Sequence, residues 1–68
     1  RHEVRLAGLP HGAYSVEVLN PQGQVLQRME HTHAQQQTID LAHLPGGALF
    51  VRVRTSTDEA TVRIIHVP

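Results

Sequence analysis

The sequence predicts an all-β fold, a small antiparallel β-sandwich of about six to seven strands. Three observations support it. Apolar and polar residues alternate in several short runs, prolines and glycines separate these runs, and no stretch carries the apolar stripe of an amphipathic helix. Because successive side chains of a strand point to opposite faces, each run offers one apolar face and one largely polar face. Such faces suit an antiparallel sheet with one side packed and the other side in water.

The expected strands are short and follow one another along the whole chain, at Val4–Leu6, Tyr14–Val18, Val25–Met29, Ile39–Leu41, Leu49–Val53 and Thr61–Val67. The segment Met29–Gln37 has fair helical propensity but no apolar face. We therefore interpret it as the end of a strand followed by a polar loop.

Turn residues predict how these strands are connected. In Leu19–Gln24, Pro21 stands at the second position of a β-turn and Gly23 at or beside its fourth. This turn makes a hairpin of the second and third strands. The polar segment Arg54–Ala60 joins the last two strands into a second hairpin with a looser turn. The six strands would then form two meanders of three.

The chain contains two similar segments, and we call this internal similarity the echo. The segment Leu6–Val18 matches Leu41–Val53 at eight of thirteen positions, with an offset of 35 residues. This offset falls in the range of repeat architectures, although two copies are too few for a solenoid. One interpretation is that the same strand–turn–strand solution was used twice. The other is an ancestral duplication with pseudo-twofold packing of the two meanders.

Composition narrows the classes of function. Six basic and six acidic side chains give a formal net charge of zero, whereas a nucleic-acid binder normally carries a basic excess. The apolar runs are far shorter than a membrane-spanning helix, and the lack of cysteine excludes disulfides and cysteine-based zinc sites. The chain begins at Arg1 without a methionine or a signal-peptide pattern. We therefore expect residues 1–68 to be a single domain from the carboxyl end of a longer protein.

Six histidines raise the question of a metal site. His31 and His33 would project from the same face of a strand and could chelate a transition metal, but a structural zinc site takes four ligands. The other histidines are scattered among turns and chain ends, without a metal-binding spacing: His2, His11, His43 and His66. We interpret the histidines as solvated surface residues and expect no metal and no other cofactor.

The sequence lacks the arrangements that are typical of catalysis. Ser15 and Ser56 stand in a strand and in a polar loop, outside the strand–turn–helix context of a serine nucleophile. Asp58 and Glu59 adjoin in a loop, where a solvated turn explains them. Carboxylates that act as acid and base need placement across a cleft, for which so small a domain has little room. We expect no enzymatic activity and no catalytic residues.

Two segments carry a resemblance to a known family. "YSVEVLNPQGQVLQRME" begins at Tyr14, and "TIDLAHLPGGALFVRVRTSTDEATVRIIHVP" runs from Thr38 to the end of the chain. Together they resemble the C-terminal sorting domain carried by cargo of the type IX (Por) secretion system of Bacteroidetes. The resemblance covers roughly residues 4 to 67, and its most specific letters are Gly23, Leu41, Leu44, Pro45, Gly47, Val51 and Val53.

The chain also departs from the family pattern. Leu49 stands where the family usually has a tyrosine two residues after the glycine, although the first copy of the echo does have Tyr14 after Gly12. The chain ends on "RIIHVP" without a cluster of basic residues, and the proline-rich opening motif is missing. These departures leave open a sorting-like domain that is retained on a component of the secretion machinery.

The resemblance implies an Ig-like β-sandwich that targets its parent protein across the outer membrane, for surface anchoring or for release. The implied partners are the outer-membrane translocon and its processing and anchoring machinery, and no nucleic acid. The implied location is the periplasm in transit, then the outer membrane, the cell surface or the extracellular space. A small extracellular β-sandwich module that binds a protein partner or a carbohydrate is the alternative.

A sorting signal needs a folded surface rather than chemistry, and two groups of residues are its candidates. The expected recognition and turn motif consists of Gly23, Leu41, Leu44, Pro45, Gly46, Gly47, Val51 and Val53. The expected recognition strand consists of Arg63, Ile64, Ile65, His66 and Val67. If that strand lies at a sheet edge, another strand could complete its backbone hydrogen bonds, including that of a second copy. For the alternative, a module that binds a protein partner, Phe50 and Arg52 share the outward side of their strand and form the expected exposed contact.

Overall fold

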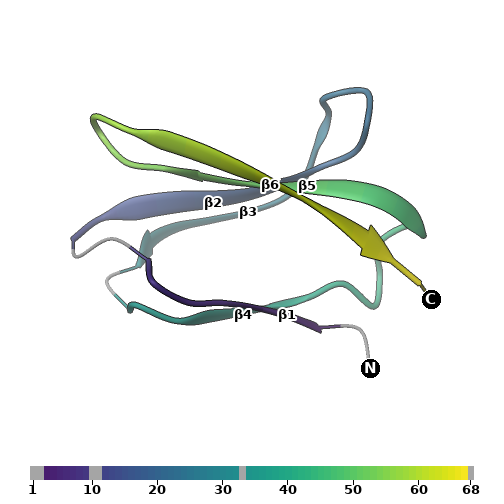
Figure 1. The fold of residues 1–68 in the computed structure, drawn as a ribbon, viewed down its shortest axis with the longest axis horizontal. Coiled ribbons are helices and arrows are strands. Elements are labelled where there is room, and N and C mark those ends of the chain that lie inside the picture. Colours follow the sequence, from purple (N-terminus) through teal and green to yellow (C-terminus); the bar gives the residue numbers. More distant parts are fainter. Residues whose placement is uncertain (1–2, 10–11, 33, 68) are drawn as a thin grey trace.

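The structure is a computed structural model that describes residues 3–9, 12–32 and 34–67, with side chains described in these ranges except at positions 31 and 32. The described part contains six strands and no helix: β1 (Glu3–Leu6), β2 (Tyr14–Leu19), β3 (Val25–Thr32), β4 (Gln37–Asp40), β5 (Gly47–Arg54) and β6 (Glu59–His66). They form two antiparallel sheets, β1–β4 and β3–β2–β5–β6, which Figure 1 shows as two layers. The predicted all-β sandwich is confirmed.

Both predicted hairpins are present. The β2–β3 turn is closed by Asn20, whose backbone N–H donates to the carbonyl of Gln24 at 3.0 Å and whose carbonyl accepts from Gly23 at 3.0 Å. Gly23 has a positive φ of 87°, which the absence of a Cβ permits. The β5–β6 turn is closed between Thr55 and Asp58. Turn residues therefore placed both connections correctly.

The expected pair of three-stranded meanders is wrong. β1 pairs with β4 rather than with β2, and β2 pairs with β5. The physical reason is that both edges of β2 are already paired, one with β3 and the other with β5, so β1 has no free edge of β2 to join. By pairing with each other, β1 and β4 form the second layer that covers the inner face of the four-stranded sheet.

The topology has the pseudo-twofold form that a repeat would produce. Exchanging β1, β2 and β3 for β4, β5 and β6 leaves the strand order of both sheets unchanged. The two strands of the echo lie side by side and antiparallel, with Val16 opposite Val53 and Val18 opposite Val51. The arrangement agrees with either origin of the echo, so an ancestral duplication stays a prediction.

The core lies between the two layers and follows the predicted alternation. Its buried residues come from both sheets and from the loops that join them: Leu9, Tyr14, Val16, Val18, Ile39, Leu41, Leu44, Leu49 and Val51. The Tyr14 hydroxyl donates to the carbonyl of Ala34, so the buried tyrosine satisfies its polar end. Leu9 and Leu44 are equivalent positions of the echo and are both buried, each just before a proline.

A matched pair of truncations tests this core. Ile39 on β4 is among the largest fully buried side chains, whereas Val62 on β6 is largely exposed. We expect Ile39→Ala to lower the free energy of unfolding by about 2–5 kcal/mol because it leaves a cavity between the layers. Val62→Ala should cost less than about 1 kcal/mol. Urea unfolding measures both values, and equal losses would contradict the placement of the core.

Candidate recognition surface

Residues 41–47, which we call the turn block, lead into β5 and combine residues buried in the core with residues exposed to solvent. Leu41 and Leu44 are buried, and the Leu44 N–H donates to the Leu41 carbonyl at 2.9 Å. Pro45 and Gly46 are exposed. Gly47 opens β5 with a φ of 104°, a conformation that residues with a Cβ rarely adopt. The two leucines therefore fix the loop to the core, and the Pro-Gly-Gly residues shape its surface.

The predicted turn residues and the predicted recognition strand meet at one end of the four-stranded sheet. Gly47 and His66 are cross-strand partners in the β5–β6 pair. Leu19, the last residue of β2 before the Gly23 turn, lies opposite Phe50 in β5. The Gly23 turn, the turn block and the end of β6 are therefore neighbours at this end, whereas Val51 and Val53 lie further along β5 toward the opposite end.

His66 is the main correction among the predicted site residues. We expected a solvated histidine, but its side chain faces inward and the residue is only 5% exposed. Its Nδ1 lies 3.1 Å from the Pro45 carbonyl oxygen, and in the tautomer with hydrogen on Nδ1 the ring donates to that oxygen. Alternation along β6 places His66 on the same side as Ile64, and this signal could have identified it. His66 thus ties the end of the last strand to the turn block.

β6 lies at the edge of the four-stranded sheet, and we call Glu59–His66 the open edge. It pairs with β5 over eight residues in one unbroken register. The opposite edge, β3, differs because its pairing with β2 has two register shifts, and irregularities of this kind protect an edge from further pairing. The open edge has neither a register shift nor a proline, so it remains available for another strand.

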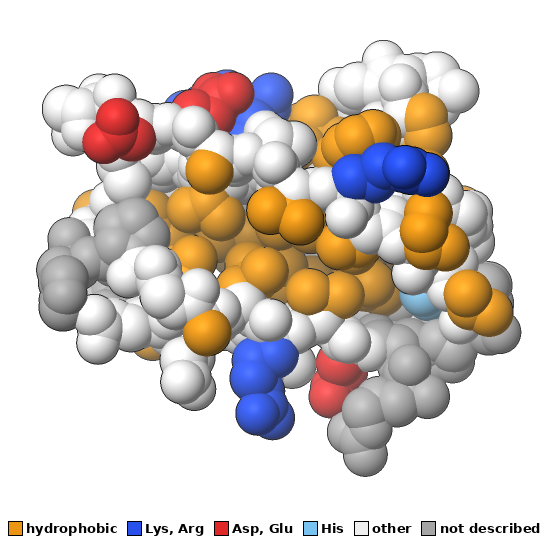
Figure 2. All heavy atoms as spheres, viewed as in Figure 1, with side chains coloured by type: hydrophobic (Ala, Val, Ile, Leu, Met, Phe, Trp, Pro, Cys, Tyr) orange, Lys and Arg blue, Asp and Glu red, His pale blue; other side chains and the backbone are white. Residues whose placement is uncertain are grey.

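Several apolar side chains on and just after the open edge are exposed to solvent. Val62 and Ile65 are each 58% exposed, although they point to opposite faces of the sheet, and Val67 is 75% exposed. Figure 2 shows a band of hydrophobic side chains on the side of the molecule where β6 and β1 face the viewer in Figure 1. The two-stranded sheet therefore leaves the β6 side of the sandwich incompletely covered.

The hairpin geometry indicates which backbone groups of the open edge point outward. The Thr55 N–H donates to the Asp58 carbonyl at 2.8 Å, so these opposite residues form a hydrogen-bonded pair. Hydrogen-bonded and non-hydrogen-bonded pairs alternate along an antiparallel ladder. Because the β5–β6 register continues from this pair without a bulge, the N–H and C=O groups that point away from β5 belong to Glu59, Thr61, Arg63 and Ile65.

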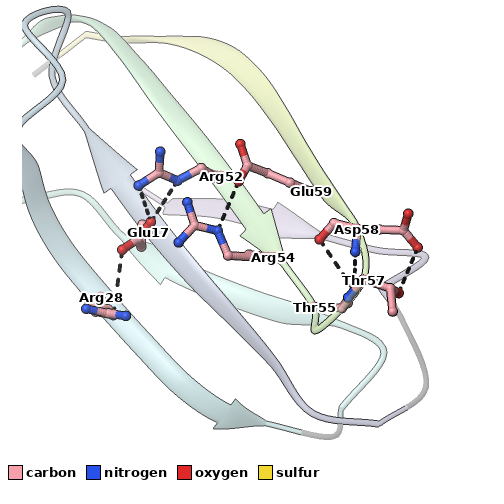
Figure 3. Close-up of polar contacts among 8 residues, drawn as sticks. All are labelled: Glu17, Arg28, Arg52, Arg54, Thr55, Thr57, Asp58 and Glu59. Carbon is pink, nitrogen blue, oxygen red and sulfur yellow. Dashed lines mark hydrogen bonds and ion pairs between the residues drawn. The ribbon is translucent and has the colours of Figure 1, made fainter.

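The outer face of the four-stranded sheet carries a network of ion pairs, shown in Figure 3. Glu17 on β2 is only 4% exposed, and one of its carboxylate oxygens accepts hydrogen bonds from both Nε (2.7 Å) and Nη2 of Arg52. Arg28 on β3 lies 3.6 Å from the other oxygen. The hydrogen bond from Arg52 lowers the pKa of Glu17 below its ordinary value, with smaller contributions from the nearby arginine charges, while burial opposes the shift.

The expected exposed contact at Phe50 and Arg52 is therefore only partly available. Both lie on the outer face as predicted, but both are half-buried. Arg52 is occupied by Glu17, and Phe50 lies between Leu19 on one side and Arg63 on the other. Alternation predicted the correct face, but it did not reveal that Glu17 and Leu19 are buried on that face.

The rest of the described surface has a shallow polar hollow and no cluster of potential metal ligands. An open hollow beside the β5–β6 turn is lined by hydroxyl and charged side chains, including Ser15, Arg54, Thr55 and Asp58. Among the described residues, no group of three or more His, Cys, Asp or Glu side chains could hold a metal ion. The predicted pair His31 and His33 lies outside the described side chains. The described residues include no helix with the length and apolarity needed to cross a membrane.

The buried carboxylate predicts a particular pH dependence. Because the pKa of Glu17 is lowered in the folded domain, its ion pair contributes stability above its ordinary value of 4.5, and this contribution is lost as pH falls through the lowered pKa. We expect Glu17→Gln to be less stable than the wild type at neutral pH and to converge with it in acid. Urea unfolding at a series of pH values measures this, and a constant difference down to about pH 2 would contradict it.

With this geometry established, comparison with known proteins identifies the chain. No curated protein and no solved structure matches it. A family model described as the secretion system C-terminal sorting domain matches residues 2–67, essentially the whole chain. The chain therefore belongs to the family of secretion system C-terminal sorting domains, the signals that direct proteins across the outer membrane through type IX secretion.

Proposed function

We propose that the secretion machinery recognises this sorting domain at the open edge and at the turn block that anchors it. The observation that carries the proposal is the unbroken, unprotected β6 strand. Its outward backbone groups at Thr61 and Arg63 can pair with an extended segment of a partner, and Ile65 provides an exposed apolar contact on the same strand. In such recognition the backbone supplies affinity and the side chains supply specificity.

The turn block has a positioning role in this proposal. The His66 ring binds the Pro45 carbonyl, and Leu41 and Leu44 hold the loop on the core. The end of β6 is therefore presented in a fixed position rather than as a frayed terminus. We infer that recognition depends on shape and strand pairing, without catalysis by the domain, and that processing and surface anchoring or release of the parent protein follow at the same machinery.

The alternative function, a carbohydrate-binding module, has less support. Sugar-binding faces usually present several exposed aromatic rings, and the chain has two aromatic residues, Tyr14 and Phe50. Tyr14 is buried in the core and Phe50 is half-buried. A protein partner at the open edge fits the exposed residues better.

A reporter-export experiment tests the proposed recognition surface. The 68-residue chain is fused to the end of a reporter in a type IX-competent cell, and surface and periplasmic reporter are measured. Arg63→Pro removes an outward N–H without removing a hydrogen bond to β5, because proline is tolerated at that side of an edge strand. We expect surface reporter to fall toward the level of a reporter without the domain, with accumulation in the periplasm.

The matched control is Val25→Pro, which places proline at the exposed first residue of the opposite edge strand β3. This variant should be exported like the wild type. Circular dichroism of both variant domains shows whether they remain folded. Equal export of folded Arg63→Pro and the wild type would reject the open edge as the recognition surface.

A further inference from the structure

The open edge is complementary to itself. Glu59, Thr61 and Arg63 follow one another on the outer face of β6, and all three point their backbone groups outward. We propose that the domain pairs with a second copy of itself through β6, antiparallel and about a twofold axis at Thr61. In this register Glu59 of each copy lies opposite Arg63 of the other copy, and two opposite-charge pairs form by symmetry.

The charges of the open edge favour this partner. Arg63 makes no ion pair with any residue in the part of the chain that the structure describes, whereas Arg28, Arg52 and Arg54 are all engaged by carboxylates. Glu59 accepts from Arg54 at 2.9 Å, and its side chain is still about half exposed. In the paired arrangement each Glu59 would lie between Arg54 of its own chain and Arg63 of the second copy, so positive and negative charges alternate across the joined sheet.

The register follows from comparing the neighbouring possibilities. Strands joined about a twofold axis perpendicular to the sheet must be centred on one residue, and outward backbone groups must face each other. Centring on Arg63 places two guanidinium groups side by side, and like charges directly opposite are destabilising. Centring on Val62 leaves Glu59 opposite Ile65. Centring on Thr61 places each Glu59 opposite Arg63 of the other copy. It also places the two Thr61 residues opposite each other, and two threonines form a favourable cross-strand pair.

The apolar residues of β6 agree with the same arrangement. On the inner face, this register places Ala60 of one copy opposite Val62 of the other, and Val62 is 58% exposed in the single chain. Pairing would therefore cover apolar surface that the two-stranded sheet leaves open. The interaction uses the edge that we assign to the secretion machinery, but it rests on β6 alone and not on that assignment.

A charge-exchange experiment with the 68-residue chain tests the proposal. Sedimentation equilibrium is measured for the wild type, for Arg63→Glu, for Glu59→Arg and for an equimolar mixture of the two variants. We expect the wild type to dimerise and each variant alone to associate at least about tenfold more weakly, because both pairs become repulsive. The mixture should regain wild-type association, because the two acidic side chains on the edge of one variant face the two basic side chains on the edge of the other.

Arg5→Glu is the matched control, since Arg5 is exposed on β1 in the other sheet and its reversal changes the net charge by as much as Arg63→Glu does. This control should leave association unchanged, and circular dichroism checks that each variant is folded. A wild type that stays monomeric at millimolar concentration would overturn the proposal, and if reporter export still requires the open edge, that edge serves the secretion machinery alone. Variants that associate like the wild type, or a mixture that fails to recover, would overturn the register.

Discussion

The structure depends on one constraint, which is that a four-stranded sheet must bury its apolar face under a sheet of only two short strands. With 68 residues the chain has no further strand in the described part to extend the smaller layer. The central strands β2 and β5 are covered, and their inward side chains Val16, Val18, Leu49 and Val51 are almost fully buried. The cover is incomplete over β6, where Ile64 packs against the core and His66 is buried but Val62 stays exposed. The same limitation therefore produces both the core and the unprotected edge.

The two edge strands of the larger sheet differ in how regular their pairing is. β3 and β6 occupy equivalent positions of the pseudo-twofold arrangement, yet only β3 is interrupted by register shifts. Exposed edges usually carry such protection, because unpaired backbone groups invite association. A sorting domain must be recognised by another protein, and a regular edge with exposed valine and isoleucine provides a surface for that purpose. In this molecule the proposed recognition surface is a consequence of incomplete coverage rather than an added site.

On the outer face of the four-stranded sheet, ion-paired side chains rather than apolar ones cover a buried residue. Glu17 stands on the side that simple alternation assigns to water, but Arg52 and Arg28 from the two neighbouring strands cover its carboxylate. These contacts link β3, β2 and β5 across the sheet. Removing one partner of such a buried ion pair is destabilising, because it leaves an uncompensated charge. The turn block performs the corresponding task at the sheet end, where His66 and Pro45 join the last strand to the loop before β5.

The strands, both hairpins and the inward faces follow from the amino-acid order alone, because alternation and turn chemistry are local properties of the chain. Tyr14, Val16, Leu49 and Gly23 could all be placed in this way. The pairing of β1 with β4 and of β2 with β5 emerges only in the folded domain, because strand partners are chosen by which distant faces must be covered. The burial of Glu17 has the same origin. Alternation along β6 already indicates the inward side for His66, but the contact of its ring with Pro45 is formed only in the folded domain. A side chain on a predicted polar face or near a chain end becomes buried when neighbours that are distant in sequence close over it, and a period of two residues carries no information about those neighbours.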